Sequence, residues 1–256
     1  MTVYRVDVVR VAAATVPNYE VFWMPAPGPN EPLVFTVGVV RGGGRVMLVN
    51  TGLPLDYQPL SDHWEAWFAP HRVVDYVRLE DALARLDVAP SDVTHVLLTP
   101  LTAYTTGRLD LFPNAQLMLG RRGWVDFWAP EPDQPALPRH IVFPDPILDY
   151  VARLPAERLR LLDDEPGEVL PGVRAWFAGG HHRSSMAYLF ATSRGTVAWC
   201  DAAFKFANLE QNLPIGIAES VLETLRTYAR LRREADLVLP PYDPDIFLRF
   251  PHGHVG

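Results

Sequence analysis

Side chains that could take part in chemistry occur in loops beside apolar segments. The run at residues 93–98 is rich in valine and leucine, which is typical of a buried strand. The hydroxyl side chains of the loop after it, residues 99–108, include those of Thr102, Tyr104 and Thr105. A second loop, residues 179–185, carries His181 and His182. Hydroxyl and imidazole groups exchange protons and form hydrogen bonds, so these residue types favour general acid/base chemistry.

The sequence gives no support for a covalent mechanism. No Gly-X-Ser-X-Gly motif occurs. Cys200 stands beside Trp199 in an expected strand, where a buried and unreactive thiol is the natural interpretation. Ser184 and Ser185 follow the two histidines closely, and hydroxyl side chains at such positions usually stabilise turns.

The elements that position these loops are expected from hydrophobic periodicity. Strands are expected at residues 4–15, 33–40, 45–49, 93–98, 115–119, 186–192 and 195–201, and a strand with a turn at residues 169–177. Helical apolar spacing predicts helices at residues 73–86 and 218–234. The stretch at residues 124–146 is dense in proline and aromatic residues, and we expect it to be irregular and to form part of a pocket wall.

Residues 91–124 resemble the central signature of the metallo-β-lactamase superfamily. The similarity lies in LLTPLTAYTTG and in FPNAQLMLGRRGW. In the superfamily the first of these blocks contains His-X-His-X-Asp-His, whose side chains bind two divalent metals, usually zinc. The corresponding positions here are Pro100, Thr102, Tyr104 and Thr105. None of these four side chains can replace the metal ligand of the family.

Four further blocks resemble the same superfamily in the same order. LVNTG has Asn50 where the family has an aspartate that supports the metal site. GGHHRSS places His181 at the position of a metal-ligating histidine, and GTVAWCD ends in Asp201, the position of the bridging aspartate. ADLVLPPYDP places Tyr242 at the last histidine. The resemblance implies an α/β fold of the αββα sandwich type, with two mixed sheets flanked by helices, formed by residues 1–256 as a single domain.

The resemblance implies that no metal and no other cofactor is bound. Two family ligands remain, His181 and Asp201, whereas a catalytic zinc normally has three protein ligands. The alternative is a metallohydrolase with relocated ligands, recruited from His182 and from loop histidines: His63, His71 and His140.

By resemblance, the former ligand positions form a polar pocket at the strand ends. There His181, oriented by Asp201, is expected to act as a general base, and Tyr104 or Tyr242 to donate a hydrogen bond to a carbonyl oxygen. Substrate contacts are expected from Thr102, Thr105, His182, Phe204, Lys205, Trp64 and Trp67. The segment that contains Phe204 is most similar to the acyl-homoserine-lactone lactonase branch, in which an aromatic residue at that position faces the lactone.

The aromatic segment at residues 63–68 has three interpretations. Core packing is the simplest of them. Its position also resembles an insertion that lactonases of the superfamily use to cover the substrate or to build a dimer, and aromatic side chains are favoured in both settings. A ligand lid and a homodimer contact are therefore the alternatives.

These features predict a metal-independent enzyme that acts by general acid/base chemistry on a small acyl, lactone or natural-product intermediate. Hydrolysis, elimination, cyclisation and isomerisation are the candidate reactions. Water without zinc is no more acidic than bulk water, which favours reactions that need proton transfer alone. The alternative is a non-catalytic pseudoenzyme that binds a small molecule or serves as the partner in an oligomer.

Composition excludes other classes of function. The 256 residues are 48% hydrophobic and carry a net charge of −7 without a basic block, so a small molecule is expected as partner and nucleic acid is not. No apolar run approaches the roughly 20 residues that cross a bilayer, so no membrane role is expected. A single cysteine excludes an internal disulfide, and the first residues lack signal-peptide features. We expect the protein in the cytoplasm.

Overall fold

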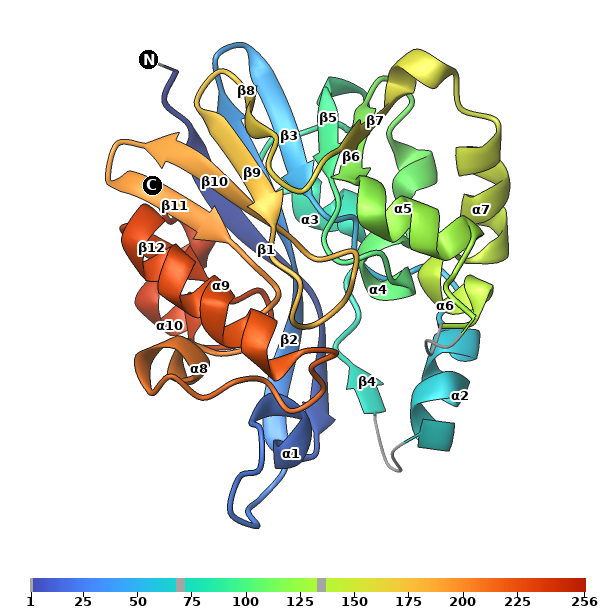
Figure 1. The fold of residues 1–256 in the computed structure, drawn as a ribbon. Coiled ribbons are helices and arrows are strands. Elements are labelled where there is room, and N and C mark those ends of the chain that lie inside the picture. Colours follow the sequence, from blue (N-terminus) through green and yellow to red (C-terminus); the bar gives the residue numbers. More distant parts are fainter. Residues whose placement is uncertain (1, 68–71, 133–136) are drawn as a thin grey trace.

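Two mixed β-sheets form the centre of the structure, a computed structural model that describes residues 2–67, 72–132 and 137–256, with the backbone alone at residues 67 and 72 (Figure 1). The larger sheet has the strand order β4 (Arg72–Val74), β1 (Arg5–Val16), β2 (Glu31–Gly42), β3 (Arg45–Val49), β5 (His95–Leu97), β6 (Gln116–Gly120) and β7 (Leu159–Leu162). Strands β3, β5, β6 and β7 are parallel, whereas β1 pairs antiparallel with both β2 and β4. The carboxyl ends of β3, β5 and β6 therefore lie at one edge.

The smaller sheet brings three more loops, each at the end of a strand, to the same region. Its order is β12 (Leu237–Leu239), β11 (Gly195–Trp199), β10 (Met186–Thr192), β9 (Val173–Phe177) and β8 (Gly167–Leu170). Strands β11 and β12 are parallel, and β10 runs antiparallel to β11. The loop before β10 and the loops after β11 and β12 consequently leave the sheet on one side. These are the loops with His181, Asp201 and Tyr242.

Helices cover the outer faces of both sheets (Figure 1). Those on the side of the larger sheet include α2 (Gln58–Trp67), α3 (Leu79–Ala84), α4 (Ala103–Thr106), α5 (Arg121–Trp128), α6 (Arg139–Val142) and α7 (Asp145–Ala152). The others are α1 (Asn18–Val21), α8 (Phe206–Glu210), α9 (Val221–Glu234) and α10 (Ile246–Arg249). This arrangement confirms the expected α/β fold of two mixed sheets flanked by helices.

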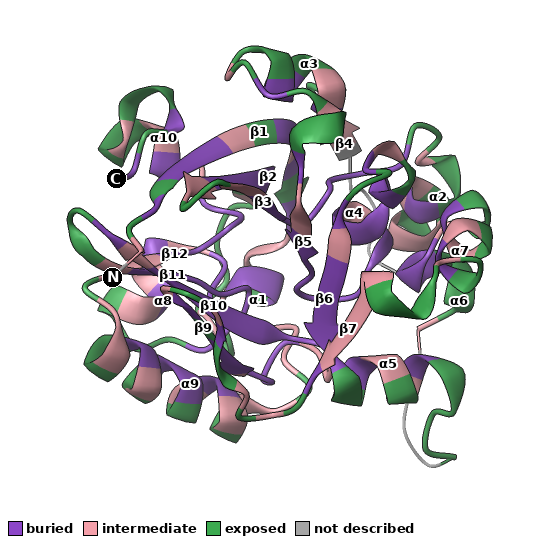
Figure 2. Ribbon diagram, turned by 90° about the horizontal axis from the view of Figure 1, so that it is seen from above, coloured by how far each residue is buried: buried purple, intermediate pink, exposed green. Residues whose placement is uncertain are grey.

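Apolar packing occurs in three layers, which explains why the strands are largely buried (Figure 2). Between the two sheets, Met47, Leu97 and Met118 of the larger sheet meet residues of the smaller one such as Tyr188 and Trp199. Residues of α3 and α7 pack on the outer face of the larger sheet, and Leu231 of α9 packs on the outer face of the smaller sheet. Strands buried on both faces have continuous apolar runs, as β2 does.

Two expectations about local structure were wrong. The predicted helix at residues 73–86 is the short strand β4 followed by α3, because Val73 and Val74 pair with β1 and Asp75 adopts a positive φ of 52°. The stretch at residues 124–146, expected to be irregular, is largely helical in its described parts. Two of its prolines begin helices instead of preventing them: Pro138 and Pro144 are the N-caps of α6 and α7.

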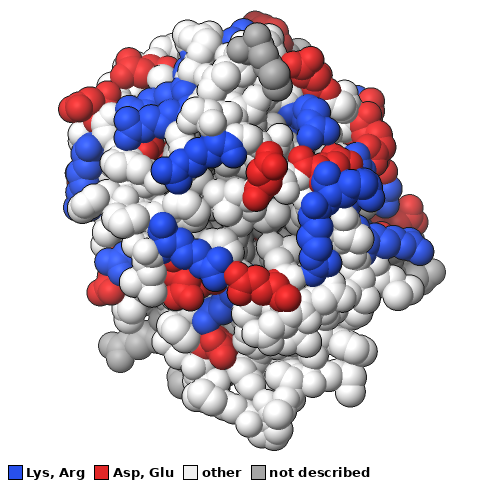
Figure 3. Space-filling view, turned by 90° about the vertical axis from the view of Figure 1, so that its left-hand side faces the viewer, with Lys and Arg blue, Asp and Glu red and all other residues white. Residues whose placement is uncertain are grey.

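The surface over the smaller sheet carries interleaved charges of both signs. On the face drawn in Figure 3, arginine and acidic side chains alternate. Pairs such as Arg174 with Glu234 and Arg230 with Glu165 neutralise one another in this part of the molecule. Over residues 2–67, 72–132 and 137–256, no helix combines the length and apolar character that crossing a bilayer requires.

Candidate active site

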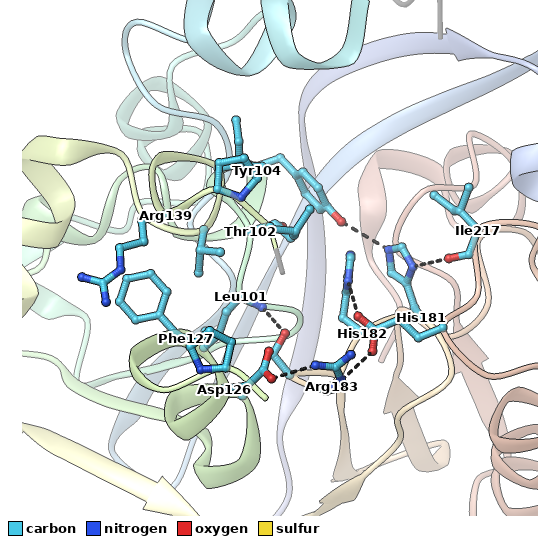
Figure 4. A pocket seen from close by; sticks show the side chains of 18 of the residues that line it. Leu101, Thr102, Tyr104, Asp126, Phe127, Arg139, His181, His182, Arg183 and Ile217 are labelled. Atoms are coloured by element: carbon cyan, nitrogen blue, oxygen red, sulfur yellow. Dashed lines mark hydrogen bonds and ion pairs between the residues drawn. The ribbon is translucent and has the colours of Figure 1, made fainter. Parts of the chain in front are cut away.

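A cavity of about 920 Å³ opens where α2, α4, α5 and α6 meet the loops around β10 and α9 (Figure 4). Most of its wall is apolar, formed by Trp64, Leu101, Phe127, Leu137, Ile141, Val142 and Ile217. Its polar lining comes from His63, Thr102, Tyr104, Asp126, Arg139, His181, His182, Arg183, Ser184 and Glu219. Residues 124–146 therefore contribute to a pocket wall, as predicted. A pocket that combines an extended apolar wall with polar groups suits an amphipathic small molecule.

Asn50 fixes the loop that leads from β5 into the cavity floor. Its amide nitrogen donates to the carbonyl oxygen of Thr99 at 2.7 Å, and its amide oxygen accepts from the Thr99 backbone nitrogen at 2.8 Å. Asn50 also adopts a positive φ of 68°, which asparagine tolerates better than most residues. A carboxylate could not donate the first of these bonds. The amide of Asn50 therefore has a structural role, because it both donates to and accepts from the backbone of Thr99.

Asp201 ties three chain segments together behind the floor. It is fully buried, and the hydroxyl oxygens of Thr99 and Ser185 each lie 2.6 Å from one of its carboxyl oxygens. Burial, partly opposed by these hydrogen bonds, raises the pKa of Asp201. Because both oxygens have these partners and His181 has others, the expected orientation of His181 by Asp201 is wrong. Asp201 instead joins the ends of β5 and β11 to the start of β10.

His181 forms the floor together with Tyr104. Its side chain is 2% exposed, and its Nδ1 lies 3.3 Å from the carbonyl oxygen of Ile217. A carbonyl oxygen can only accept, so Nδ1 carries the proton of the neutral ring. The lone pair of Nε2 then faces the Tyr104 hydroxyl at 3.3 Å. Burial, together with the neighbouring His182, holds the pKa of His181 well below its usual range, so the ring is neutral at neutral pH.

Burial raises the pKa of Tyr104, so its hydroxyl keeps its proton at neutral pH.

The threonines near Tyr104 have different roles. Thr102 lines the cavity as predicted. The hydroxyl of Thr105 does not, because it lies 2.6 Å from the Pro100 carbonyl oxygen and 2.7 Å from that of Thr102. Thr105 therefore holds the turn at α4 and is not placed to contact a substrate.

Aromatic rings fill the space beside His181. Phe35 stacks on Trp64 with ring centroids 5.5 Å apart and lies 5.4 Å from the ring of Tyr104. Tyr242 packs edge-on against Tyr104 and, at 4.9 Å, against Phe204. The Tyr242 hydroxyl is buried and has no hydrogen-bond partner among the described residues. Tyr242 and Phe204 thus lie behind the lining, whereas Trp64 reaches the cavity.

A histidine–carboxylate contact lies at the cavity wall, and the acidic residues around it were not predicted from the sequence. Nδ1 of His182 is 3.5 Å from the carboxylate of Glu219. Arg183 bridges Glu219 and Asp126, at 3.6 Å and 2.8 Å respectively (Figure 4). Asp126 lies in α5 and Glu219 precedes α9, so no spacing in the sequence connects them with residues 182 and 183.

Of the other predicted substrate contacts, Lys205 does not reach the cavity and the side chain of Trp67 cannot be placed. Lys205 pairs with Glu31 at 2.5 Å and does not line the cavity. The side chain of Trp67 and the whole of His71 lie outside the described residues.

Cys200 is buried, and burial raises the pKa of its thiol, in keeping with an unreactive cysteine.

The side chains at the family's ligand positions do not fit a metal ion. Both nitrogens of His181 and both oxygens of Asp201 face partners within the protein, and the rings of Tyr104 and Tyr242 pack beside them. In the described part of the chain, no three histidine, cysteine, aspartate or glutamate side chains are arranged to hold an ion. A site relocated to His182 and His63 is therefore not supported by the described residues.

Solved structures that are similar to this chain include several hydrolases. An N-acyl homoserine lactone hydrolase, with N-hexanoyl-L-homoserine at its catalytic metal center, matches 98% of this chain and 99% of its own, with a TM-score of 0.77 and 17% identity. A probable metal-dependent hydrolase from Staphylococcus aureus matches 94% and 89%, with a TM-score of 0.71 and 14% identity. A hydrolase of the beta lactamase superfamily matches 98% and 89%, with a TM-score of 0.67 and 16% identity.

These matches establish the metallo-β-lactamase fold for this chain, as the sequence blocks implied. No protein-family model matches the sequence, and no curated protein matches it. At such low identity the likeness concerns the fold, and function depends on the residues of the site itself.

Proposed function

We propose that the protein is an enzyme that transfers protons on a small acyl compound without a metal, with Tyr104 and His181 as its catalytic residues. One observation carries the proposal: the Tyr104 hydroxyl faces Nε2 of a buried, neutral imidazole at the floor of a largely apolar cavity. A neutral imidazole can accept a proton and a phenol can donate a hydrogen bond, so the pair contains both a base and an acid.

The proposed reaction begins when a substrate carbonyl replaces the contact between the two side chains. The carbonyl oxygen accepts the hydrogen bond from Tyr104, which frees the lone pair of Nε2 on His181. Nε2 takes a proton from the carbon next to the carbonyl, and the C–H electron pair forms an enolate held by the Tyr104 hydroxyl. When the enolate is conjugated with a carbon–carbon double bond, return of the proton to the far carbon of that bond shifts the double bond and completes an isomerisation. Loss of a leaving group from the neighbouring carbon, with its electron pair, completes an elimination.

The cavity wall supports an acyl compound as the substrate. Phe127, Ile141 and Val142 form an apolar surface beside the polar floor, which suits an aliphatic chain attached to a carbonyl group. The solved lactone hydrolase with a bound N-hexanoyl product has the same fold and supports this class by analogy.

Ligand binding without turnover is the second candidate. It is favoured by the hydrogen bonds that already occupy both ring nitrogens of His181 and by the aromatic rings packed beside it. In that case Tyr104 and His181 satisfy one another as buried polar groups.

Deuterium exchange tests the proposal because it detects proton transfer at carbon whichever product is formed. Acyl lactones, acyl thioesters and β-keto esters are incubated with the protein in D₂O, and mass spectrometry follows deuterium at the carbon next to the carbonyl. We expect exchange with the wild type and with the surface control Arg85→Gln, and its loss in His181→Gln and Tyr104→Phe. Exchange that survives His181→Gln, or no exchange with any compound, would refute the proposed role. Hydrolysis would appear in the same spectra as addition of water.

A further inference from the structure

The cavity contains one arginine whose charge is not neutralised by the surrounding residues. Four charged side chains line the cavity: Asp126, Arg139, Arg183 and Glu219. Both carboxylates contact Arg183, at 2.8 Å from Asp126 and 3.6 Å from Glu219. Within the described ranges, Arg139 has no ion pair and no hydrogen bond to its guanidinium; its neighbours there are aromatic rings. The two carboxylates are thus committed to Arg183, and Arg139 is left as an open positive charge.

Arg139 is exposed, and its guanidinium lies over two aromatic rings. Its central carbon lies 5.6 Å from the ring centroid of Phe127 and 5.3 Å from that of Trp128. Stacking on ring faces leaves the N–H groups at the edge of the guanidinium plane free to donate. Phe127 and Trp128 belong to α5, whereas Arg139 begins α6, so two helices define the position.

Arg139 lies on the opposite side of the cavity from His181, with the apolar wall between them (Figure 4). A ligand that reaches both sides therefore needs a polar group at each end and an apolar segment in between. A planar guanidinium with free edges matches a carboxylate, which can accept two parallel hydrogen bonds.

We propose that Arg139 is a substrate-recognition residue and that the substrate of this cavity is an acyl compound with a distal carboxylate. This inference rests on the proposed function for the reacting end of the molecule. The apolar segment packs along Phe127, Ile141 and Val142, and the carboxylate pairs with Arg139. The four charges that line the cavity sum to zero and the protein as a whole carries a net charge of −7, so the attraction for an anion comes from direct contact with Arg139 and acts against the average field of the molecule.

Binding of two non-reactive probes tests the inference. Decanoate and decanamide share one chain and differ in charge, and titration calorimetry measures their affinities below the concentration at which decanoate forms micelles. We expect decanoate to bind about tenfold more tightly than decanamide to the wild type, because a hydrogen-bonded charge pair adds affinity. Arg139→Gln should abolish this preference and leave the decanamide affinity unchanged. Arg139→Lys, which retains the charge without the planar fork, should keep part of it.

Three outcomes would overturn the inference: equal affinity for the two probes, a preference that survives Arg139→Gln, or no binding of either probe. Tighter binding of decyl phosphate than of decanoate would also reject a carboxylate. His181→Gln should keep the preference, because this variant removes the base and leaves Arg139 in place. A carboxylate preference without deuterium exchange would uphold the role of Arg139 and refute the proposed reaction. Deuterium exchange without a carboxylate preference would uphold the proposed reaction and refute the role of Arg139.

Discussion

Oγ1 of Thr99 lies 2.6 Å from Oδ1 of Asp201 and also 2.9 Å from the carbonyl oxygen of Met186. The Met186 backbone nitrogen donates to the same hydroxyl oxygen at 2.8 Å. A hydroxyl has one proton, so it cannot donate to both acceptors fully at once. A protonated Asp201 resolves the conflict, because it donates to Thr99 while Thr99 donates to Met186. The raised pKa of Asp201, caused mainly by burial, agrees with this arrangement.

Asp201→Asn should therefore fold and should be more stable than the wild type at neutral pH, by about 1 kcal/mol. The asparagine amide can donate to Thr99 and accept from Ser185, as the protonated carboxyl group does, but the native state no longer has to bind a proton that the unfolded chain releases at neutral pH. The native pKa of Asp201 lies above its unfolded value, so its stabilising contribution is present at low pH and is lost as pH rises through the native pKa. The advantage of the variant should shrink on acidification. Urea unfolding at neutral and acidic pH checks this, and a large loss of stability at neutral pH would contradict it.

Asn50→Asp, which restores the residue typical of the superfamily, should destabilise the protein by roughly 3 kcal/mol. The carboxylate cannot donate to the Thr99 carbonyl oxygen, and the position is 2% exposed, so a buried acceptor and a buried charge result. Asn114→Asp is the matched control, because its amide also donates to a backbone carbonyl, that of Ser91, but is exposed. Chemical denaturation should separate the two variants, and equal effects would contradict the structural role of Asn50.

Tyr242→Phe should leave stability unchanged or raise it by up to about 1 kcal/mol, because it removes a buried hydroxyl that has no partner among the described residues. Tyr228→Phe is the control: its hydroxyl donates to the Ala202 carbonyl oxygen at 2.9 Å, and its loss should cost about 1 kcal/mol. Thermal unfolding compares them. The sequence suggested Tyr242 as a hydrogen-bond donor to the substrate, and abolished deuterium exchange in Tyr242→Phe would restore that role.

Stability should decrease in mild acid because of His181. Its native pKa is well below the unfolded value, mainly through burial and also through the adjacent His182. The unfolded chain therefore gains a proton first as the pH falls below about 6.5, and the native state loses about 1.4 kcal/mol per pH unit until His181 itself is protonated. His181→Gln should remove this part of the pH dependence, whereas the exposed His140→Gln should retain it. Identical pH profiles for His181→Gln and the wild type would contradict the assignment.

The sequence predicted the fold well because the superfamily blocks lie at the ends of strands that the fold requires. The run that ends before Thr99 and the strand that ends before Asp201 are apolar and short, so their hydrophobic pattern identified them directly. Local errors arose where tertiary contacts decided the structure. Val73 and Val74 follow a helical pattern with the next residues but pair with β1 instead.

The site was predicted in part. His181, Tyr104, Thr102, His182 and Trp64 line the cavity, because the motif fixes which loops meet. The partners of these side chains could not be predicted, since Ile217, Glu219 and Asp126 come from segments without a motif. Asp201 has a role that the motif did not reveal, because its two hydroxyl partners make it a structural junction.

The metal content of the purified protein tests the central claim most directly. The protein is prepared without chelator and without added histidines, its zinc, iron and manganese are measured by plasma mass spectrometry, and its thermal unfolding is recorded with zinc and with chelator. We expect far less than one metal ion per chain and the same unfolding temperature in both conditions, because His181, Tyr104 and Asp201 at the ligand positions already face hydrogen-bond partners within the protein. Near-stoichiometric metal, together with destabilisation by chelator, would contradict it.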